Sequence, residues 1–293
     1  MQSVLIVGCG DVGLRVARRY HKRGAAVAGV VRGDASIRRL AAERIPALQV
    51  DLDYPVSPGT LPTGGAIVHY YVPPPREGKG DPRIEHFLAS IGRDAMPARI
   101  VYISTSGVYG DCNGEWVTEQ RPPAPDSDRG RRRLAAEESL RRWCEARDAE
   151  HVILRVPGIY GPGRLPIKRL KSGSPVVDER ECSFSNRIQV DDLVSICVAA
   201  GEKGPGNIVY NVSDGDPTTM TEYFMEIADF LGLEPPPVIS LDEARELLSP
   251  AMLSFLNESK RLDNRLLLKH LKVKLKYPSL ARGLPASVPG GHL

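Results

Sequence analysis

The stretch Gly8-Cys9-Gly10-Asp11-Val12-Gly13 follows the apolar run Val4-Leu5-Ile6-Val7 and opens a segment with helical periodicity over residues 11–23. A continuous apolar run of this kind is typical of a strand buried on both faces. The glycines allow a tight turn, a close approach of a ligand to the backbone, and close packing of the helix on the strand. The free N–H groups and the dipole at the start of that helix attract phosphates. We therefore expect this turn to bind a dinucleotide pyrophosphate, and not to be merely a structural turn.

Strand and helix patterns alternate along the rest of the first half of the chain. Strands are predicted over residues 26–31, 47–50, 66–72, 99–104 and 152–156, and helices over residues 36–44, 83–94 and 127–147. Repeated βα units predict an α/β fold with a Rossmann-type, doubly wound parallel sheet and right-handed crossovers.

The pattern loosens after Pro157, which suggests a second, smaller unit. We expect a Rossmann core over residues 1–160, rejoined by a helix over 191–203 and a strand over 207–212 within residues 191–213. Residues 161–190 and 214–285 are expected to form a small substrate-binding lobe. A polar, Gly- and Pro-rich surface loop is predicted over residues 111–125, and a flexible tail over residues 286–293.

The composition excludes several classes of protein. The formal net charge is only +3 over 293 residues, which gives no reason to expect nucleic acid or an anionic membrane as a partner. The five cysteines form no CxxC pair, so free thiols in a reducing compartment are expected and a metal site is not. No apolar stretch reaches the roughly 20 residues of a membrane span, and no signal peptide is evident. A cytoplasmic protein is the resulting expectation.

The end of the second predicted strand bears on the choice of cofactor. An acidic residue commonly occupies this place in NAD sites, where it binds the ribose 2′-OH. Here Arg32 stands in that place, and its guanidinium could bind the 2′-phosphate of NADP. The sequence therefore favours NADP(H) over NAD(H). Two alternatives are that Asp34 reaches the ribose from a shifted loop, or that Arg32 is simply solvated.

Three later motifs point to a known group of proteins. They are Ser104-Thr105-Ser106-Gly107-Val108-Tyr109-Gly110, residues 155–163 (RVPGIYGPG) and residues 187–193 (RIQVDDL). Together with the glycine turn they resemble the extended short-chain dehydrogenase/reductase superfamily, of the NAD-dependent epimerase/dehydratase type. The resemblance extends over residues 1–285.

The resemblance implies a set of site residues. Thr105 matches the catalytic hydroxyl of the family, with Ser106 as the alternative. The cofactor contacts implied beyond the glycine turn are Asp51, Leu52, Tyr71, Val72, Pro73, Ser104, Pro157, Gly158 and Ile159. The implied substrate contacts, in addition to Thr105, are Tyr109, Tyr160 and Arg187.

The chain departs from the family at the Tyr-x-x-x-Lys pair. Arg129 stands where the family has the catalytic tyrosine, and Arg133 stands where it has the lysine. Arg133 could still bind the ribose hydroxyls. A guanidinium stays protonated and has no acceptor, so Arg129 cannot act as the family's acid/base. Tyr71 is one candidate for a substitute proton donor.

Arg129 lies in a run of arginines near the start of a predicted helix. It could bind an anionic substrate, belong to a solvated basic face, or form part of a docking patch for a protein. The sequence favours an NADP(H)-dependent oxidoreductase or epimerase that acts on an anionic or hydroxylated small molecule through a non-standard proton relay. The alternative is a non-catalytic NADP(H)-binding sensor or regulatory protein. The resemblance is also compatible with a homodimer.

Overall fold

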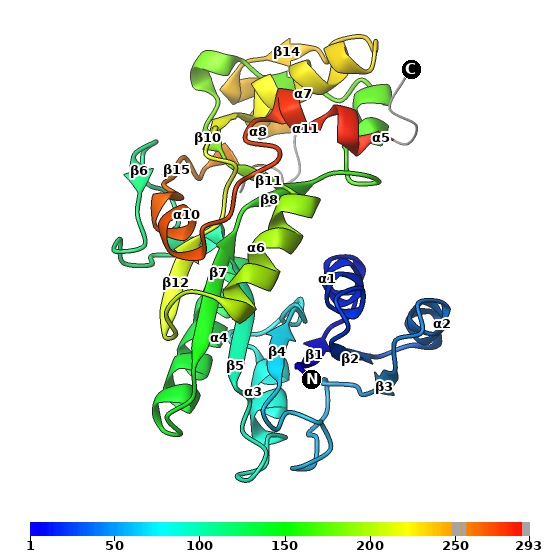
Figure 1. Cartoon of the computed structure of the whole chain (residues 1–293). Coiled ribbons are helices and arrows are strands. Elements are labelled where there is room, and N and C mark those ends of the chain that lie inside the picture. The colour runs from blue at the N-terminus through cyan, green and yellow to red at the C-terminus, as the bar shows by residue number, and fades with distance from the viewer. Residues whose placement is uncertain (248–252, 254–255, 289–293) are drawn as a thin grey trace.

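A seven-stranded parallel sheet forms the centre of the computed structural model, which describes residues 1–247, 253 and 256–288. The strand order is β12-β7-β5-β4-β1-β2-β3 (Figure 1). Its members are β1 (Ser3–Val7), β2 (Ala26–Val31), β3 (Ala47–Gln49), β4 (Ile67–Tyr70), β5 (Arg99–Thr105), β7 (His151–Val156) and β12 (Ile208–Asn211). The predicted Rossmann-type doubly wound fold is confirmed. The strand order reverses between β1 and β4, and such a switch point leaves a crevice at the carboxyl ends of the strands.

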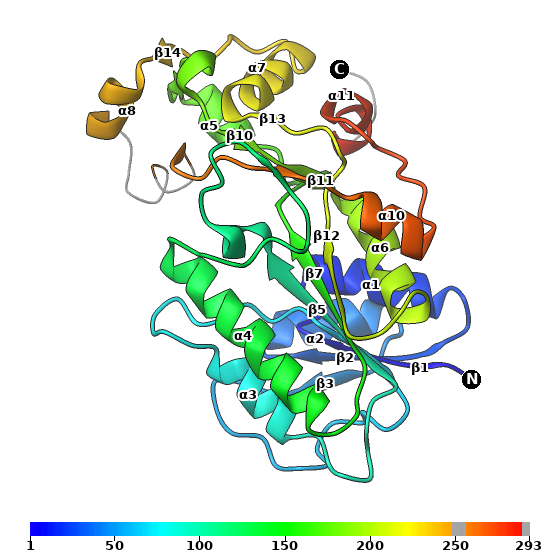
Figure 2. The ribbon, with the colours of Figure 1, turned by 90° about the vertical axis from the view of Figure 1, so that its left-hand side faces the viewer.

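Helices cover both faces of this sheet (Figures 1 and 2). One face carries α1 (Asp11–His21), α2 (Asp34–Ala42) and α6 (Val190–Glu202), whose apolar side chains share one core with β1. The other face carries α3 (Pro82–Ala89) and α4 (Asp128–Glu145), which contribute to a second core. Burial on both faces explains why the strands are apolar runs without alternation.

A smaller unit lies over the carboxyl ends of the strands (Figure 1). Its elements before β12 are β8 (Gly158–Tyr160), α5 (Ile167–Lys171), β9 (Val176–Val177), η2 (Glu179–Glu181), β10 (Phe184–Ser185) and β11 (Arg187–Gln189). Those after β12 are β13 (Thr218–Thr219), α7 (Met220–Phe230), β14 (Val238–Ile239), α8 (Leu241–Leu247), β15 (Arg261–Leu262), α11 (Leu280–Gly283) and η3 (Pro285–Ser287). The helix α10 (Arg265–Leu271) instead packs on the main core, where Leu267 and Leu271 join the apolar side chains of α6. None of the described helices is long and apolar enough to cross a membrane.

Two predictions about irregular segments need correction. The expected surface loop over residues 111–125 contains β6 (Trp116–Val117), which pairs in parallel with β15, and both Cys112 and Val117 are fully buried. Its partner lies more than 140 residues away in the chain, so local composition could not reveal the pairing. The tail predicted to be flexible begins in η3 with Ser287 buried, while residues 289–293 lie outside the described part.

A buried ion pair joins the sheet to α4. Glu137 of α4 is fully buried, and it accepts hydrogen bonds from Nε and Nη2 of Arg155 on β7 at 3.1 and 2.8 Å. The same carboxylate accepts from Ser104 Oγ at 2.6 Å. Its four hydrogen bonds include one from Arg141 Nη2 at 3.0 Å, so the charge is well compensated.

We predict that Glu137→Ala destabilises the fold by about 3–5 kcal/mol, because it leaves the Arg155 guanidinium buried without its counter-ion. Urea unfolding measures the free energy of unfolding. Glu138→Ala is the matched control, since Glu138 is the exposed neighbour on the same helix. A loss for Glu137→Ala no larger than that for Glu138→Ala would contradict this role.

Candidate functional site

The glycine turn lies in the crevice at the switch point, against the end of β4. Gly8 has a φ of +89°, and a Cβ there would lie 2.8 Å from the backbone nitrogen of Val72. A Cβ on Gly13 would lie 2.8 Å from the Gly8 carbonyl oxygen, whereas nothing lies within 4 Å of that position at Gly10. Two glycines therefore permit the packing, and Gly10 exposes backbone to open space. This is the cradle that a pyrophosphate requires.

A cavity of about 300 Å³ extends from this turn towards the end of β2. It is lined by Gly8, Cys9, Gly10, Val30, Val31, Arg32, Ser36, Val50, Asp51, Leu52, Tyr71, Val72, Pro73 and Arg83. Eight of the predicted cofactor residues thus meet in one place. Asp11 and Val12 stand at the start of α1 outside this lining, where Asp11 pairs with Arg15 and Arg164 at 3.1 and 2.6 Å.

An acidic residue between two arginines marks the outer end of the cavity. Asp53 accepts hydrogen bonds from Arg83 Nε and, at 3.0 Å, from Arg32 Nη1. The hydrogen bond from Arg83 lowers the pKa of Asp53. The sequence analysis missed Arg83, which is placed by the N-cap of α3: Asp81 accepts from the backbone nitrogen of Arg83 at 3.1 Å. No motif connects Arg83 with Arg32, so only the folded chain reveals the pair.

Tyr71 lines this cavity, but its hydroxyl points into the protein. Tyr20 donates to the Val198 carbonyl oxygen at 3.3 Å and therefore accepts from His69 Nε2 at 3.2 Å. His69 Nδ1 then accepts from the Tyr71 hydroxyl at 2.8 Å. Burial lowers the pKa of His69 to about 3 and raises that of Tyr71 well above its usual value. The hydroxyl of Tyr71 is therefore engaged in a series of hydrogen bonds between neutral, buried side chains. This position does not support the predicted role of Tyr71 as a proton donor.

A second cavity of about 260 Å³ lies between the end of β5 and the small lobe. Its lining consists of Thr105, Ser106, Gly107, Arg129, Pro157, Gly158, Ile159, Tyr160, Phe184, Ser185, Asn186, Arg187, Met220, Tyr223, Glu258 and Lys260. It brings together Arg129 and seven of the residues predicted from the three motifs, namely Thr105, Ser106, Pro157, Gly158, Ile159, Tyr160 and Arg187. The contributions of β10, α7 and residues 258–260 were not predicted, because the resemblance places Ser259-Lys260-Arg261 in the C-terminal lobe without a role in the site, and no motif marks the other segments.

Thr105 ends β5 at the wall of this second cavity. It caps the short helix η1 (Ser106–Tyr109), and its Oγ1 accepts from the Gly107 backbone nitrogen at 3.2 Å. α4 begins beside η1, where a Cβ on Gly130 would lie 2.7 Å from the Gly107 carbonyl oxygen. This close contact fixes the first turn of α4, which carries Arg129, next to the threonine.

Arg129 stands at the edge of the second cavity. Burial lowers the pKa of the Arg129 guanidinium, because it removes water from the charged group. The negative charge of the Glu258 carboxylate acts in the opposite direction and raises this pKa. Arg187 also lines this cavity and is buried, where it donates to Ser185 Oγ at 2.8 Å and stacks over the Tyr223 ring at 4.3 Å. The walls of the cavity therefore carry cationic groups from both lobes.

Three predicted contacts lie elsewhere in the structure. Arg133 donates to the Ile103 carbonyl oxygen at 3.0 Å and is in the lining of neither cavity. Ser104 faces α4, because successive strand residues point to opposite faces. Tyr109 is buried and donates to Asn211 Oδ1 at 2.7 Å. The predicted ligand contacts of these three side chains are therefore not supported by their positions.

The comparisons with known proteins agree with this geometry. Residues 84–213 match the model of the NAD dependent epimerase/dehydratase family. Protein YeeZ of Escherichia coli (strain K12) is 28% identical over 249 residues, which cover 80% of this chain and 86% of that protein.

Two solved structures are similar over almost the whole chain. A functionally unknown conserved protein from Silicibacter pomeroyi DSS is 29% identical with a TM-score of 0.84, and 98% of each chain is covered. A UDP-glucuronic acid 4-epimerase from Bacillus cereus, in complex with UDP-glucuronic acid and NAD, is 19% identical with a TM-score of 0.78 and 98% coverage of each chain. Residues 84–213 therefore resemble the NAD dependent epimerase/dehydratase family, and the chain as a whole shares the Rossmann-type fold of these solved structures.

Proposed function

We propose that this protein is an NADP(H)-dependent oxidoreductase or epimerase that acts on an anionic small molecule. The observation that carries the proposal is the pair of cavities at the carboxyl ends of the strands. One contains a glycine cradle with arginines at its outer end, and the other contains Thr105 and Ser106 among cationic side chains. A dinucleotide that spans both would bring its nicotinamide to the end of β5, along the carboxyl ends of the strands, where sheets of this kind bind their ligands.

The residues of this chain fit such a cofactor. Gly8, Gly10 and the start of α1 would hold the pyrophosphate, and Asp51 and Leu52 would line the adenine site. Pro157, Gly158 and Ile159 would lie beside the nicotinamide, because they line the cavity that Thr105 shares. When bound, the cofactor supplies or accepts a hydride. The protein orients the substrate and manages the proton.

The arrangement around Asp53 supports NADP over NAD. Arg32 and Arg83 place two guanidinium groups beside the Asp53 carboxylate at this end of the cavity. The Arg32 side chain is 66% exposed, which lets it turn from Asp53 to a 2′-phosphate. Arginine binds phosphate well because its planar fork can donate two parallel hydrogen bonds.

The charges of the second cavity support an anionic substrate. Arg129, Arg187 and Lys260 contribute three cations to its lining, against the single carboxylate of Glu258. The sugar nucleotide in the Bacillus cereus epimerase structure is itself an anion, which belongs to the same class of ligand. Thr105 would polarise a substrate carbonyl or hydroxyl. Because Arg129 cannot release its proton near neutral pH, the proton relay differs from that of a tyrosine.

Turnover of NADPH tests this function against a panel of anionic carbonyl compounds and oxidised sugar nucleotides. We expect Thr105→Ala to abolish turnover and to preserve NADPH binding, because the hydroxyl acts on the substrate. Thr118→Ala, which alters an exposed threonine outside the cavity, is the control. Tight NADPH binding without turnover of any compound would instead favour a non-catalytic sensor.

We predict that Arg32→Ala weakens the binding of NADPH by about 10–100-fold and leaves the affinity for NADH within about twofold. The lost charged hydrogen bonds to the 2′-phosphate are worth about 1.5–3 kcal/mol. Fluorescence titration measures both dissociation constants. Arg23→Ala is the control, because Arg23 pairs with Glu202 outside this cavity. Equal losses for the two dinucleotides would contradict the preference for NADP.

We also predict that Arg129→Ala weakens the binding of small anions in the second cavity by about tenfold or more, as expected for the loss of a charged hydrogen bond. Calorimetric titration with oxalate and with UDP, in the presence of NADP⁺, measures the effect. The matched control is Arg131→Ala, since Arg131 lies two residues further on, pairs with Asp128 at 2.7 Å and does not line the cavity. Unchanged affinity in Arg129→Ala would exclude an anion site at this residue.

A further inference from the structure

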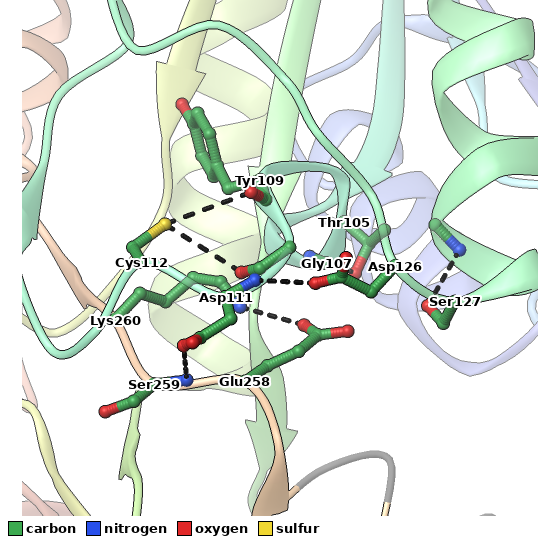
Figure 3. Close-up of polar contacts among 12 residues, drawn as sticks. Thr105, Gly107, Tyr109, Asp111, Cys112, Asp126, Ser127, Glu258, Ser259 and Lys260 are labelled. Atoms are coloured by element: carbon green, nitrogen blue, oxygen red, sulfur yellow. Dashed lines mark hydrogen bonds and ion pairs between the residues drawn. The ribbon is translucent and has the colours of Figure 1, made fainter.

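A lysine and a glutamate from the C-terminal part of the chain complete the cavity that holds Thr105. Lys260 Nζ donates to Glu258 Oε2 at 2.8 Å, and both side chains line the cavity. The Lys260 side chain is only 6% exposed, although it belongs to a residue type that is almost never buried without a reason. Figure 3 shows the pair beside Gly107 and Thr105 at the end of β5.

The backbone around Lys260 is held from two sides, which fixes the position of the side chain. On one side, Ser259 donates its backbone N–H to Asp111 Oδ1 at 2.8 Å (Figure 3). On the other side, Asn186 donates from Nδ2 to the Lys260 carbonyl oxygen at 2.9 Å and accepts from the Leu262 backbone nitrogen at 2.8 Å. Asn186 itself lines the cavity. The lysine therefore lies on a rigid support, as a group that reacts with a substrate must.

An ammonium group can do what Arg129 cannot. The ordinary pKa of a lysine side chain, about 10.4, is close to that of a tyrosine, about 10, whereas a guanidinium keeps its proton at all relevant pH values. An ammonium has three N–H donors, and within the described residues Nζ makes only the hydrogen bond to Glu258. The remaining donors are available to a ligand in the cavity.

We propose that Lys260 is the catalytic acid/base of this site and that Glu258 is its positioning residue. In the reducing direction an N–H bond of the ammonium breaks and an O–H bond forms on the substrate oxygen, which leaves a neutral amine that regains its proton from water. The reduced dinucleotide supplies the hydride and both electrons to the carbonyl carbon and is oxidised. In the oxidising direction the amine accepts the hydroxyl proton. This inference rests on the proposed oxidoreductase or epimerase function.

Glu258 and Arg129 explain why the lysine is held where it is. The Glu258 carboxylate bonds to Lys260, and its charge also acts on Arg129 at the start of α4. The carboxylate thus acts on two cations of the cavity lining, Lys260 and Arg129. It balances the charge of the ammonium and orients Nζ. Arg129 is left to bind the anionic part of the substrate.

Chemical rescue of Lys260→Ala tests the proposal. With the substrate found in the turnover panel, we expect kcat to fall by about 10²–10⁴-fold, the range for the loss of a general acid. Added ethylamine should raise the kcat of Lys260→Ala at least tenfold, because it fits the space left by the side chain and carries a transferable proton. Guanidinium ion should not. Lys168→Ala, which alters an exposed lysine outside the cavity, should keep its activity and show no response to ethylamine.

Binding of NADPH provides a second readout that does not depend on turnover. We expect fluorescence titration to give the same affinity within twofold for the wild type, Lys260→Ala and Glu258→Gln. Glu258→Gln keeps the shape of the side chain and should lower kcat by about tenfold with little change in KM, and ethylamine should not rescue it. This variant also tests the pair if Lys260→Ala does not fold.

The outcomes separate the two proposals. An inactive wild type would overturn the proposed function. An active wild type whose kcat changes by less than threefold in Lys260→Ala would overturn only the role of the lysine. Equal rescue by guanidinium and ethylamine would also overturn it, because a charge alone would then suffice. Loss of NADPH binding in Lys260→Ala would assign the residue to the cofactor site instead.

Discussion

The contact between the glycine turn and the end of β4 is the constraint on which the rest of the structure depends. Gly8 lies so close to Val72 that no side chain fits between them. This contact holds β1 against β4 at the point where the order of the strands reverses, and it opens the crevice above them. The first cavity begins at this crevice, and the second lies between the end of β5 and the small lobe.

The helices on the two faces of the sheet are held by different interactions near this crevice. On one face, α1 and α6 pack tightly around His69. The hydrogen bonds of His69 to Tyr20 and Tyr71 satisfy the polar atoms of these side chains inside the protein. On the other face, α4 is attached to the sheet by the ion pair between Glu137 and Arg155. That pair orients the helix whose first turn presents Arg129. Stability and the geometry of the candidate site are therefore coupled through a single helix.

Much of the fold follows from local patterns along the chain. Strand β2 has the predicted bounds, and α1 begins at the predicted residue, because buried parallel strands and amphipathic helices leave clear signals. The motif residues Thr105 and Tyr160 meet in one cavity as the resemblance implied. The sequence motifs did not predict the orientation of the Tyr71 and Arg133 side chains. A motif assigns a residue to an element, whereas its hydrogen-bond partners decide where the side chain points.

The sequence by itself determined the Rossmann core, the glycine turn and the replacement of the tyrosine by Arg129, because each depends on residues close together in the chain. Only the tertiary structure brought Arg83 beside Arg32, and Lys260 beside Thr105. Residues 258–262 reach the second cavity because β15 pairs with β6 and because Asn186 forms hydrogen bonds with Lys260 and Leu262. Such contacts join segments separated by more than 50 residues, and no periodicity or spacing in the sequence records them.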